Sequence, residues 1–540
     1  MAATDFAAEI EQVFAERDPV SPEQREAQIL EQAQPIVERL QRQAGDACSL
    51  RGEIERRWLD DLRQYAGVRA GSSTTKDGKT DESDYEKGES TLFVNITRPK
   101  TNRTEGRLFD ILFPADDKNW GISATPVPDL AFVAKRAMEE AEKAAGQATQ
   151  LQNGDVAMEG QDVDGLLQKA SDLGQQAAEA RKTIDAADRA AELMAEQIDD
   201  DLTQCRYPRK ARDAIGWACK LGVGILKGPL VKDYNRKGWQ KDEGGKYALQ
   251  MGDEIGRPSV ECVKPHAFFP DPSATSMEDC EYVYERHLPS KQELRQMAKK
   301  LKFNPIAVKQ LLEDGPDKGT GGDLAHLVEI RSLTGESTPI TNRYVLWEYH
   351  GPLMTDEIVT LITAMGGKDV EERVRKFSAE GESVDSVNVI AYFCNGRLLK
   401  ISEYYPMDSQ ALIYSVFSLE KGEASVLGAI GVPRMMRDSQ EALNAAWRMM
   451  MDNSGLSTGP QVLIDMAAVQ PVKGEDFRMR PRKTWLWDSA HSQGQPPFQA
   501  FNILSNQEEL AGIITLAMTF IDEETAMPRV GLKEMDAARK

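Results

Sequence analysis

The sequence has few of the patterns that identify an enzyme. No G-x-x-x-x-G-K-[ST] pattern occurs among the 540 residues, which argues against a phosphate-binding loop of that type. The five histidines are isolated from one another, so no metal-ligating pair of the H-E-x-x-H kind is present. Carboxylates are abundant, yet no Asp/Glu pair is distinguished by its neighbours. We therefore expect no catalytic residue, no cofactor and no bound metal ion.

Paired cysteines and long apolar runs are also lacking. The six cysteines include no C-x-x-C pair, which is typical of reduced thiols in a cytosolic setting. No apolar run approaches the length of about 18 residues that a membrane-spanning helix needs. The first residues, MAATDFAAEIEQVFAERD, lack the basic and apolar regions of a secretory signal. The sequence predicts neither a membrane span nor secretion.

The charge balance is strongly acidic. The chain has 87 Asp and Glu against 66 Lys and Arg, a net charge of −21. Proteins that hold nucleic acid gain affinity from basic groups that neutralise phosphates, and this chain has the opposite balance. Two interpretations remain: the protein never meets nucleic acid, or it meets nucleic acid where adhesion would be harmful.

Helical patterns occupy much of the chain. Ser290 and Glu293 have the spacing of a capping box, as do Ser21 with Gln24 and Ser505 with Glu508. The Ala-rich stretch 130–200 predicts an antiparallel helical hairpin, and the polar stretch 67–90 predicts a mobile loop. We expect helices over 21–65, 99–113, 130–200, 209–231, 290–314, 354–379, 432–452 and 505–524.

Strand patterns fill much of the remainder. Between 230 and 284 the apolar segments are short and separated by Gly and Pro. Further strands are expected at 92–96, 326–333, 343–351, 387–401, 460–465 and 483–488. The sequence therefore predicts an α+β, helix-rich protein with several domains.

The stretch VKPHAFFPDPSATSMEDCEYVYERHLPSKQEL (263–294) allows two interpretations. His266 and Asp271 could belong to a site assembled in three dimensions. Alternatively, its prolines restrict the backbone and form a stiff turn. We favour a structural hinge.

Two glycine-containing motifs resemble sites of chemistry. GVGILKG (222–228) has its third glycine one residue late for a dinucleotide loop, and a helix rather than a strand is expected before it. GLSTG (455–459) matches the nucleophile elbow of serine hydrolases, which needs a strand before Ser457 and a helix after it. The expected order is the reverse, so Ser457 is interpreted as part of a helix C-terminal turn, with a hydrolase as the alternative.

One basic and aromatic cluster, FRMRPRKTWLWD (477–488), could contact phosphates. Alternation along a strand would instead place Trp485 and Trp487 on one buried face and leave the basic side chains in solvent. The basic residues concerned are Arg478, Arg480, Arg482 and Lys483.

The helix expected at 432–452 is apolar around most of its circumference. It contains five methionines together with Leu443 and Trp447. Such a helix must be enclosed by its own fold or by neighbouring subunits, and Met-rich surfaces repack readily.

In order, these pieces resemble the portal proteins (head-to-tail connectors) of tailed bacteriophages, particularly short-tailed ones. The resemblance covers most of 92–530 and depends on the order of elements. The Q-x-x-x-N spacing of Gln440 and Asn444 is similar to that of the family's second stem helix. The matching segments are VNITRPKTNRTEGRLFDILFPADDKNWGI, LGVGILKGPLV, VKPHAFFPDPSATSMEDCEYVYERHLPSKQEL, GVPRMMRDSQEALNAAWRMMMDN and PQVLID…RPRKTWLWD…PPFQAFNI.

The resemblance implies a division into domains. These would be N-terminal helices and a mobile loop (1–91), a wing with a helical insert near 130–200 (92–289), a first stem helix and linker (290–324), a clip (325–430), a second stem helix (431–455), and a wing return, channel loop and start of a crown (456–540). The family usually continues with further crown or barrel segments, and the insert is longer than the resemblance requires.

The resemblance also implies a function without catalysis. A ring of twelve subunits at one capsid vertex would carry double-stranded DNA through its channel. It would bind terminase, a tail adaptor, scaffold and major capsid proteins, in the virion and, before assembly, in the host cytoplasm. Candidate residues are Arg478, Arg480, Arg482 and Lys483 for the channel, Met435, Met436, Gln440, Asn444, Trp447 and Met450 for the subunit interface, and Glu371 and Glu372 for motor or tail docking. A cytosolic helical adaptor that binds through 130–200 is the remaining alternative.

Overall fold

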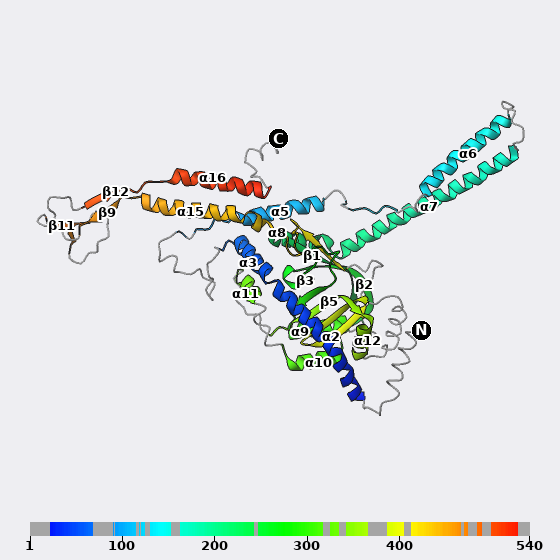
Figure 1. Cartoon of the computed structure of the whole chain (residues 1–540), viewed down its shortest axis with the longest axis horizontal. Helices are drawn as coiled ribbons and strands as arrows, with labels where there is room; N and C mark the ends of the chain where they lie inside the picture. The colour runs from blue at the N-terminus through cyan, green and yellow to red at the C-terminus, as the bar shows by residue number, and fades with distance from the viewer. Residues whose placement is uncertain are drawn as a thin grey trace. The chain divides into compact units, whose positions relative to one another are not determined.

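The computed structural model describes residues 22–68, 90, 92–114, 118, 120–124, 130–152, 163–241, 247–316, 325–333, 342–365, 386–403, 412–465, 469–472, 483–488 and 498–526. These residues form thirteen α-helices and several small sheets, which confirms the mixed α+β class (Figure 1). The chain divides into two compact units. The first comprises Met1–Gly106, Ala214–Ile225 and Val263–Lys540, and the second Arg107–Asp213 and Leu226–Cys262.

A five-stranded antiparallel sheet is the centre of the first unit. Its strand order is β3-β4-β5-β6-β7. The sheet takes strands from both sides of the boundaries expected at 289/290 and 324/325, so these boundaries pass through one folded body. The strands are β3 (Phe268–Pro270), β4 (Val283–His287), β5 (Leu346–Met354), β6 (Ser386–Cys394) and β7 (Arg397–Glu403).

Helices cover both faces of this sheet. On one face, α2 (Pro22–Leu50) packs a stripe of small and aliphatic residues, including Val37 and Leu40, together with α12 (Thr355–Met365). On the other face lie α9 (Lys291–Leu301) and α10 (Pro305–Asp314), whose Leu294 and Leu311 are fully buried. The alternation of side chains along a strand supplies both cores.

The local sequence explains where two helices start, but it does not explain the structure of the segment 326–333. The capping box of Ser290 and Glu293 is formed at the start of α9, as predicted. Pro305 occupies the first turn of α10, where its missing N–H is not needed. The strand expected at 326–333 is wrong, because this segment is a helix, α11 (Ala325–Ser332), whose Glu329 pairs with Arg63. Apolar alternation over so few residues fits both periods, and this tertiary contact favours the helix.

The N-terminal helical stretch is divided in two. After α2, α3 (Gly52–Ala66) ends at Gly67, whose φ of 86° lies in the left-handed region. The loop expected at 67–90 lies almost entirely outside the described residues.

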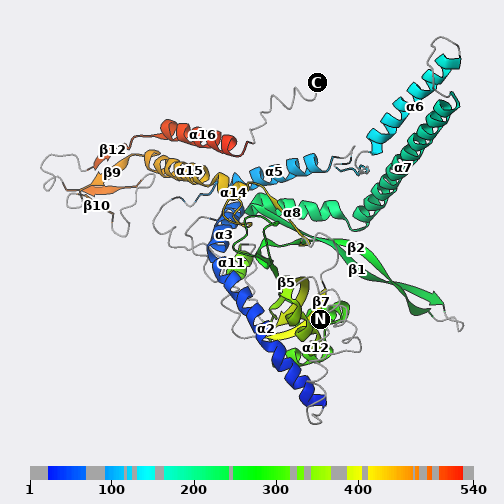
Figure 2. The ribbon, with the colours of Figure 1, turned by 45° about the vertical axis from the view of Figure 1, so that its right-hand side comes forward.

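A second group of helices in this unit packs around the stretch 92–96. α14 (Val432–Met435) and α15 (Arg437–Ser457) occupy the predicted 432–452, and Pro433 lies in the first turn as expected. Gly455 lies inside α15 and not beyond its end. α16 (Gln507–Glu524) packs along α15 through Ile514 and Ala517 (Figure 2). The box predicted at Ser505 is not formed, because Asn506 occupies the N-cap position.

Short ladders connect α15 to α16. β9 (Gln461–Ile464) pairs with β12 (Phe498–Phe501), and β10 (Val469–Pro471) pairs with β11 (Trp485–Trp487), all antiparallel. The strands predicted at 460–465 and 483–488 are confirmed. Elsewhere in this unit, the Leu419 amide beside β8 (Tyr414–Ser418) donates to the Gly222 carbonyl.

The helix predicted over 209–231 ends early. α8 (Tyr207–Leu221) stops at Gly222, whose φ is 92°, and β1 (Val223–Lys241) follows. A Cβ on Gly222 would lie 2.4 Å from the Ala429 carbonyl oxygen, so a larger residue does not fit. GVGILKG is therefore a helix-to-strand junction.

The second unit holds the helical hairpin predicted at 130–200. α6 (Leu130–Gln152) and α7 (Val163–Gln204) run antiparallel and side by side (Figures 1 and 2). Buried alanines, among them Ala148 and Ala177, form their contact. β1 also pairs with β2 (Tyr247–Val263), and α5 (Thr97–Leu112) contributes residues to both units. In the described part of the chain, no helix combines the length and apolarity needed to cross a bilayer.

Candidate functional site

Glu285 and Glu348 face each other across two neighbouring strands. They are direct partners in the antiparallel pairing of β4 and β5, which places their side chains on one face of the sheet. Only 6% and 4% of their surfaces are exposed. Two carboxylates opposite each other in a buried position repel when both are ionised, so the pair needs a compensating group.

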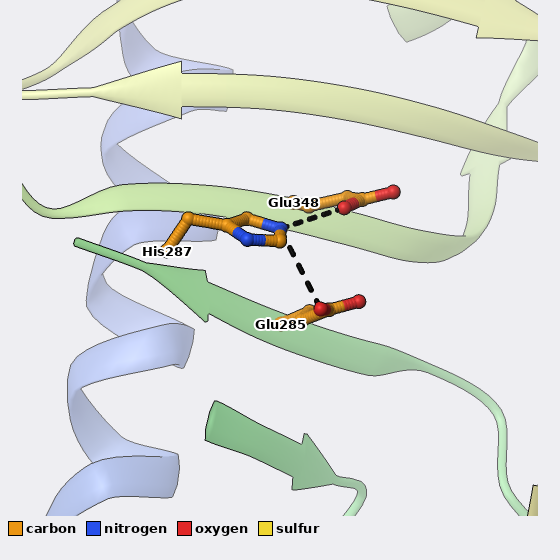
Figure 3. A group of neighbouring side chains, drawn as sticks. All are labelled: Glu285, His287 and Glu348. Carbon is orange, nitrogen blue, oxygen red and sulfur yellow. Dashed lines mark hydrogen bonds and ion pairs between the residues drawn. The ribbon is translucent and has the colours of Figure 1, made fainter. Parts of the chain in front are cut away.

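His287 places one nitrogen between these carboxylates. It lies two residues after Glu285 on β4, and therefore on the same face. Its Nε2 is 2.8 Å from Glu348 Oε2 and 3.7 Å from Glu285 Oε1 (Figure 3). Among the described residues, this is the group of three whose ligand atoms all lie within 4.8 Å of one another. Imidazole and carboxylate in this number can hold a divalent ion of the zinc type.

Buried donors hold the outer oxygens of the two carboxylates. The Tyr414 hydroxyl donates to Glu285 Oε2 at 2.9 Å, and the Tyr392 hydroxyl donates to Glu348 Oε1 at 2.8 Å. The fully buried His350 brings Nε2 to 2.9 Å from the same Glu348 oxygen. Burial, and then the Glu285 carboxylate, raise the pKa of Tyr414 well above its ordinary value, so this hydroxyl keeps its proton and remains a donor.

The next residue along β4 belongs to the opposite face. The Arg286 guanidinium donates to the His266 carbonyl at 3.2 Å and lies 5.0 Å from the centre of the Phe269 ring. Phe269 belongs to the core under α2, away from the carboxylates. The alternation of the strand therefore directs this cation away from the Glu285 carboxylate.

A cavity of about 700 Å³ adjoins this region and includes His287 and His266 in its wall. Its wall is largely apolar, and its charged residues are mostly basic: Lys264, Arg286, Lys300, Arg331 and Arg343 against Glu293. Such a wall attracts anions.

The structure does not unite His266 and Asp271 in one site. His266 packs edge-on against Trp58 and Trp217, with ring centres 5.2 and 6.1 Å away. Burial, and next the charge of Arg51, lower the pKa of His266 to about 3, so the ring is neutral. Asp271 Oδ1 instead accepts hydrogen bonds from the amide and hydroxyl of Ser273. This segment is a turn with a buried histidine.

Three of the six interface candidates between 435 and 450 are buried within the chain. Gln440 and Asn444 are buried and bind the backbone of 92–96. Met436 is fully buried beside Val432 and Ile521. Three candidates are half-buried and retain exposed surface: Met435, Trp447 and Met450.

Most candidates for DNA and motor contacts lie outside the described residues, namely Arg478, Arg480, Arg482, Glu371 and Glu372. Lys483 is described, and its Nζ lies 4.4 Å from the centre of the Trp485 ring. Trp487 is 54% exposed in the isolated chain, so this chain alone does not bury the tryptophan face.

Ser457 lies in the last turn of α15, and its hydroxyl donates to the Ser454 carbonyl at 3.5 Å. A helix precedes it and a strand follows, as the sequence indicated. The strained strand-to-helix turn of a nucleophile elbow is therefore not formed.

The sequence contains a signal for the glutamate–histidine cluster that a search for paired histidines does not detect. Two E-x-H tripeptides occur, Glu285-x-His287 and Glu348-x-His350, each inside a strand. Residues two apart on a strand share a face, so each tripeptide presents a carboxylate and an imidazole together. Their approach depends on the register of β4 and β5, which the sequence does not specify.

No family model matches this chain, and no curated protein matches it.

Proposed function

We propose that this protein is a portal subunit that assembles into a ring at one vertex of a phage capsid. The proposal rests on the order of elements in the sequence and on one structural observation. Large apolar side chains remain exposed along α15, the β9–β12 ladders and α16: Met449, Met451, Leu456, Leu463, Leu486, Trp487, Phe501, Leu504, Ile513, Leu516 and Phe520. Apolar surface gathered on one stretch of chain is typical of a surface covered by a partner.

Copies of the same chain are the partner that this surface favours. Ile513, Leu516 and Phe520 have the i, i+3, i+7 spacing of one helix face, and α16 buries a different face against α15. A head-to-tail contact between different surfaces of identical chains closes into a ring when the rotation permits. The half-buried Met435, Trp447 and Met450 fit the rim of such a contact.

The acidic charge supports a protein that lets DNA pass through it rather than one that binds DNA tightly. Twelve copies at −21 each carry −252. A DNA duplex that passes such a ring is repelled overall, and basic contacts are confined to a few positions such as Lys483. We propose that the energy for packaging comes from a separate motor ATPase. Terminase, a tail adaptor, scaffold and capsid proteins are the proposed partners, in the virion and earlier in the host cytoplasm.

The test is electron microscopy of the purified protein, with averaged views of any large particle. We expect rings of about twelve subunits around a central hole wide enough for duplex DNA. A protein that stays monomeric at high concentration, also with scaffold protein added, contradicts the proposal. Loss of a binding partner on deletion of 130–200 from such a monomer would identify a helical adaptor instead.

A further inference from the structure

We propose that Glu285, His287 and Glu348 bind one divalent transition-metal ion, with Zn²⁺ the best fit, inside the five-stranded sheet of each chain. The site lies within one chain, so the proposal does not depend on ring formation or on a role in DNA packaging.

The spacing of the ligand atoms suits a small ion. Zinc bonds of about 2.0–2.1 Å in a tetrahedron separate neighbouring ligand atoms by roughly 3.3–3.4 Å. The Nε2 atom of His287 lies 2.8 Å from one carboxylate oxygen and 3.7 Å from the other, on either side of that separation. All three ligand atoms lie within 4.8 Å of one another, so small side-chain rotations bring them to bonding distance.

The surroundings hold the ligands in a binding orientation. Tyr414 fixes the outer oxygen of Glu285, while Tyr392 and His350 fix the outer oxygen of Glu348. The inner oxygens, Glu285 Oε1 and Glu348 Oε2, are the ones that face His287 (Figure 3). Hydrogen bonds to ligating carboxylates are the usual second layer of a metal site, and paired strands give it rigidity.

Charge and access also favour an ion. Two carboxylates with 6% and 4% exposure are costly together, and a divalent cation balances them at their own position. The imidazole ligand and the mixed nitrogen and oxygen set favour Zn²⁺ over Mg²⁺ or Ca²⁺, which take oxygen ligands. The His287 side chain is 26% exposed and lines the 700 Å³ cavity, so the ligand nitrogen can be reached from solvent, although the basic residues of that wall do not themselves attract a cation.

The experiment uses the full-length protein after chelator treatment, titrated with ZnCl₂ by calorimetry and checked by elemental analysis. We expect about one Zn²⁺ per chain and a higher melting temperature in its presence. His287→Gln should abolish the uptake. Tyr392→Phe, which removes only a supporting hydrogen bond, should weaken it about 10- to 100-fold. Glu441→Gln on the exposed surface of α15 is the control for a substitution outside the cluster and should bind as the wild type does.

Co²⁺ gives a readout that does not depend on the variants. Bound at one nitrogen and two carboxylate oxygens in a four- or five-coordinate site, it should develop visible absorption that added Zn²⁺ removes. Wild-type protein without metal uptake, or His287→Gln with unchanged uptake and normal circular dichroism, overturns the proposal.

Discussion

The side chain of Gln440 makes hydrogen bonds with the backbone around Val94, in the way that the backbone of a neighbouring strand would. Its side-chain Nε2 donates to the Val94 carbonyl at 2.7 Å, while its Oε1 accepts from the Ile96 amide at 3.2 Å. Asn444, one helical turn later, accepts from the Val94 amide at 2.8 Å. The predicted strand at 92–96 is therefore wrong: the segment belongs to no strand, and two side chains of α15 bind the backbone groups of Val94 and Ile96.

The first prediction concerns this pair. Gln440→Leu leaves the part-buried Val94 carbonyl and Ile96 amide without their partner, and each unsatisfied group costs about 1–3 kcal/mol. We expect the free energy of unfolding to fall by roughly 2–4 kcal/mol, measured by urea titration. Glu441→Gln, exposed on the same helix, is the control and should unfold like the wild type. Equal stability of Gln440→Leu and the wild type would show that these hydrogen bonds do not support the fold.

The second prediction concerns Arg51, which is buried and joins α3 to the turn at 265–268. Its guanidinium donates to the carbonyls of Pro265 and His266, pairs with Glu55, and lies 3.6 Å from the centre of the Phe269 ring. Arg51→Met keeps the length but removes the donor from one carboxylate and from three carbonyls, since Arg51 also donates to the Phe268 carbonyl. We therefore expect a loss of about 3–5 kcal/mol in the free energy of unfolding.

Arg51→Lys should recover only part of this stability, because an ammonium group cannot reproduce the planar fork of the guanidinium. The measurement is thermal unfolding of both variants beside the wild type. Full recovery by lysine would show that charge alone, and not the donor geometry, stabilises the turn.

The third prediction concerns the acid side of the stability curve. His266 has a pKa of about 3 in the folded chain against an ordinary value of 6.5, so the unfolded state binds more protons between these values. The contribution of a neutral His266 is fully present above pH 6.5 and is lost as pH falls toward 3, at up to about 1.4 kcal/mol per pH unit. His266→Phe should reduce this slope in urea titrations from pH 4.5 to 7. An unchanged slope would contradict the assignment.

The fourth prediction has the opposite sign. Burial raises the pKa of Asp61 to about 6 from an ordinary 3.8, so the folded state binds more protons in that interval. Ionised Asp61 therefore lowers stability as pH rises through about 4 to 6 and afterwards remains unfavourable. Asp61→Asn should remove this fall and be more stable relative to the wild type at pH 7 than at pH 4, in the same urea titrations. A relative stability that does not change with pH would contradict the raised pKa.

The fifth prediction concerns assembly. Leu516→Glu with Phe520→Glu places charges on the exposed face of α16, where we propose that a second copy packs. Because both side chains are about half exposed, the fold should persist by circular dichroism while large particles disappear in size-exclusion chromatography. Thr515→Glu, exposed on another side of α16, is the matched control and should assemble. Assembly of the double variant would exclude this face from the contact.

Local patterns in the sequence predicted the elements whose signals are complete within a few residues. Ser290 and Glu293 form their capping box, and the hairpin at 130–200 forms as expected. These local patterns failed where contacts with a segment distant in the sequence determine the secondary structure. The segment 325–332 is a helix whose Glu329 contacts Arg63. The helix α8 ends at Gly222, where the Ala429 backbone lies too close for a side chain.

The candidate sites could likewise be predicted where the signal is local in the sequence, but not where it depends on tertiary contacts. The absence of the nucleophile-elbow geometry at Ser457 follows from element order alone, which the sequence provides. The Glu285, His287 and Glu348 cluster depends on strand register across about 60 residues of intervening chain, and register is a property of tertiary pairing. Gln440 and Asn444 were expected at a subunit contact because their helix resembles the second stem helix of portal proteins, and their intrachain partners at 94–96 lie far away in sequence.

The central claim, ring assembly of identical subunits, is tested most directly by the mass of the purified wild-type protein in solution, by sedimentation velocity over a range of concentrations. We predict a closed species of about twelve 60.0 kDa chains, roughly 720 kDa, that persists on dilution. A single species of 60.0 kDa at every concentration, unchanged by added scaffold protein, would contradict the account.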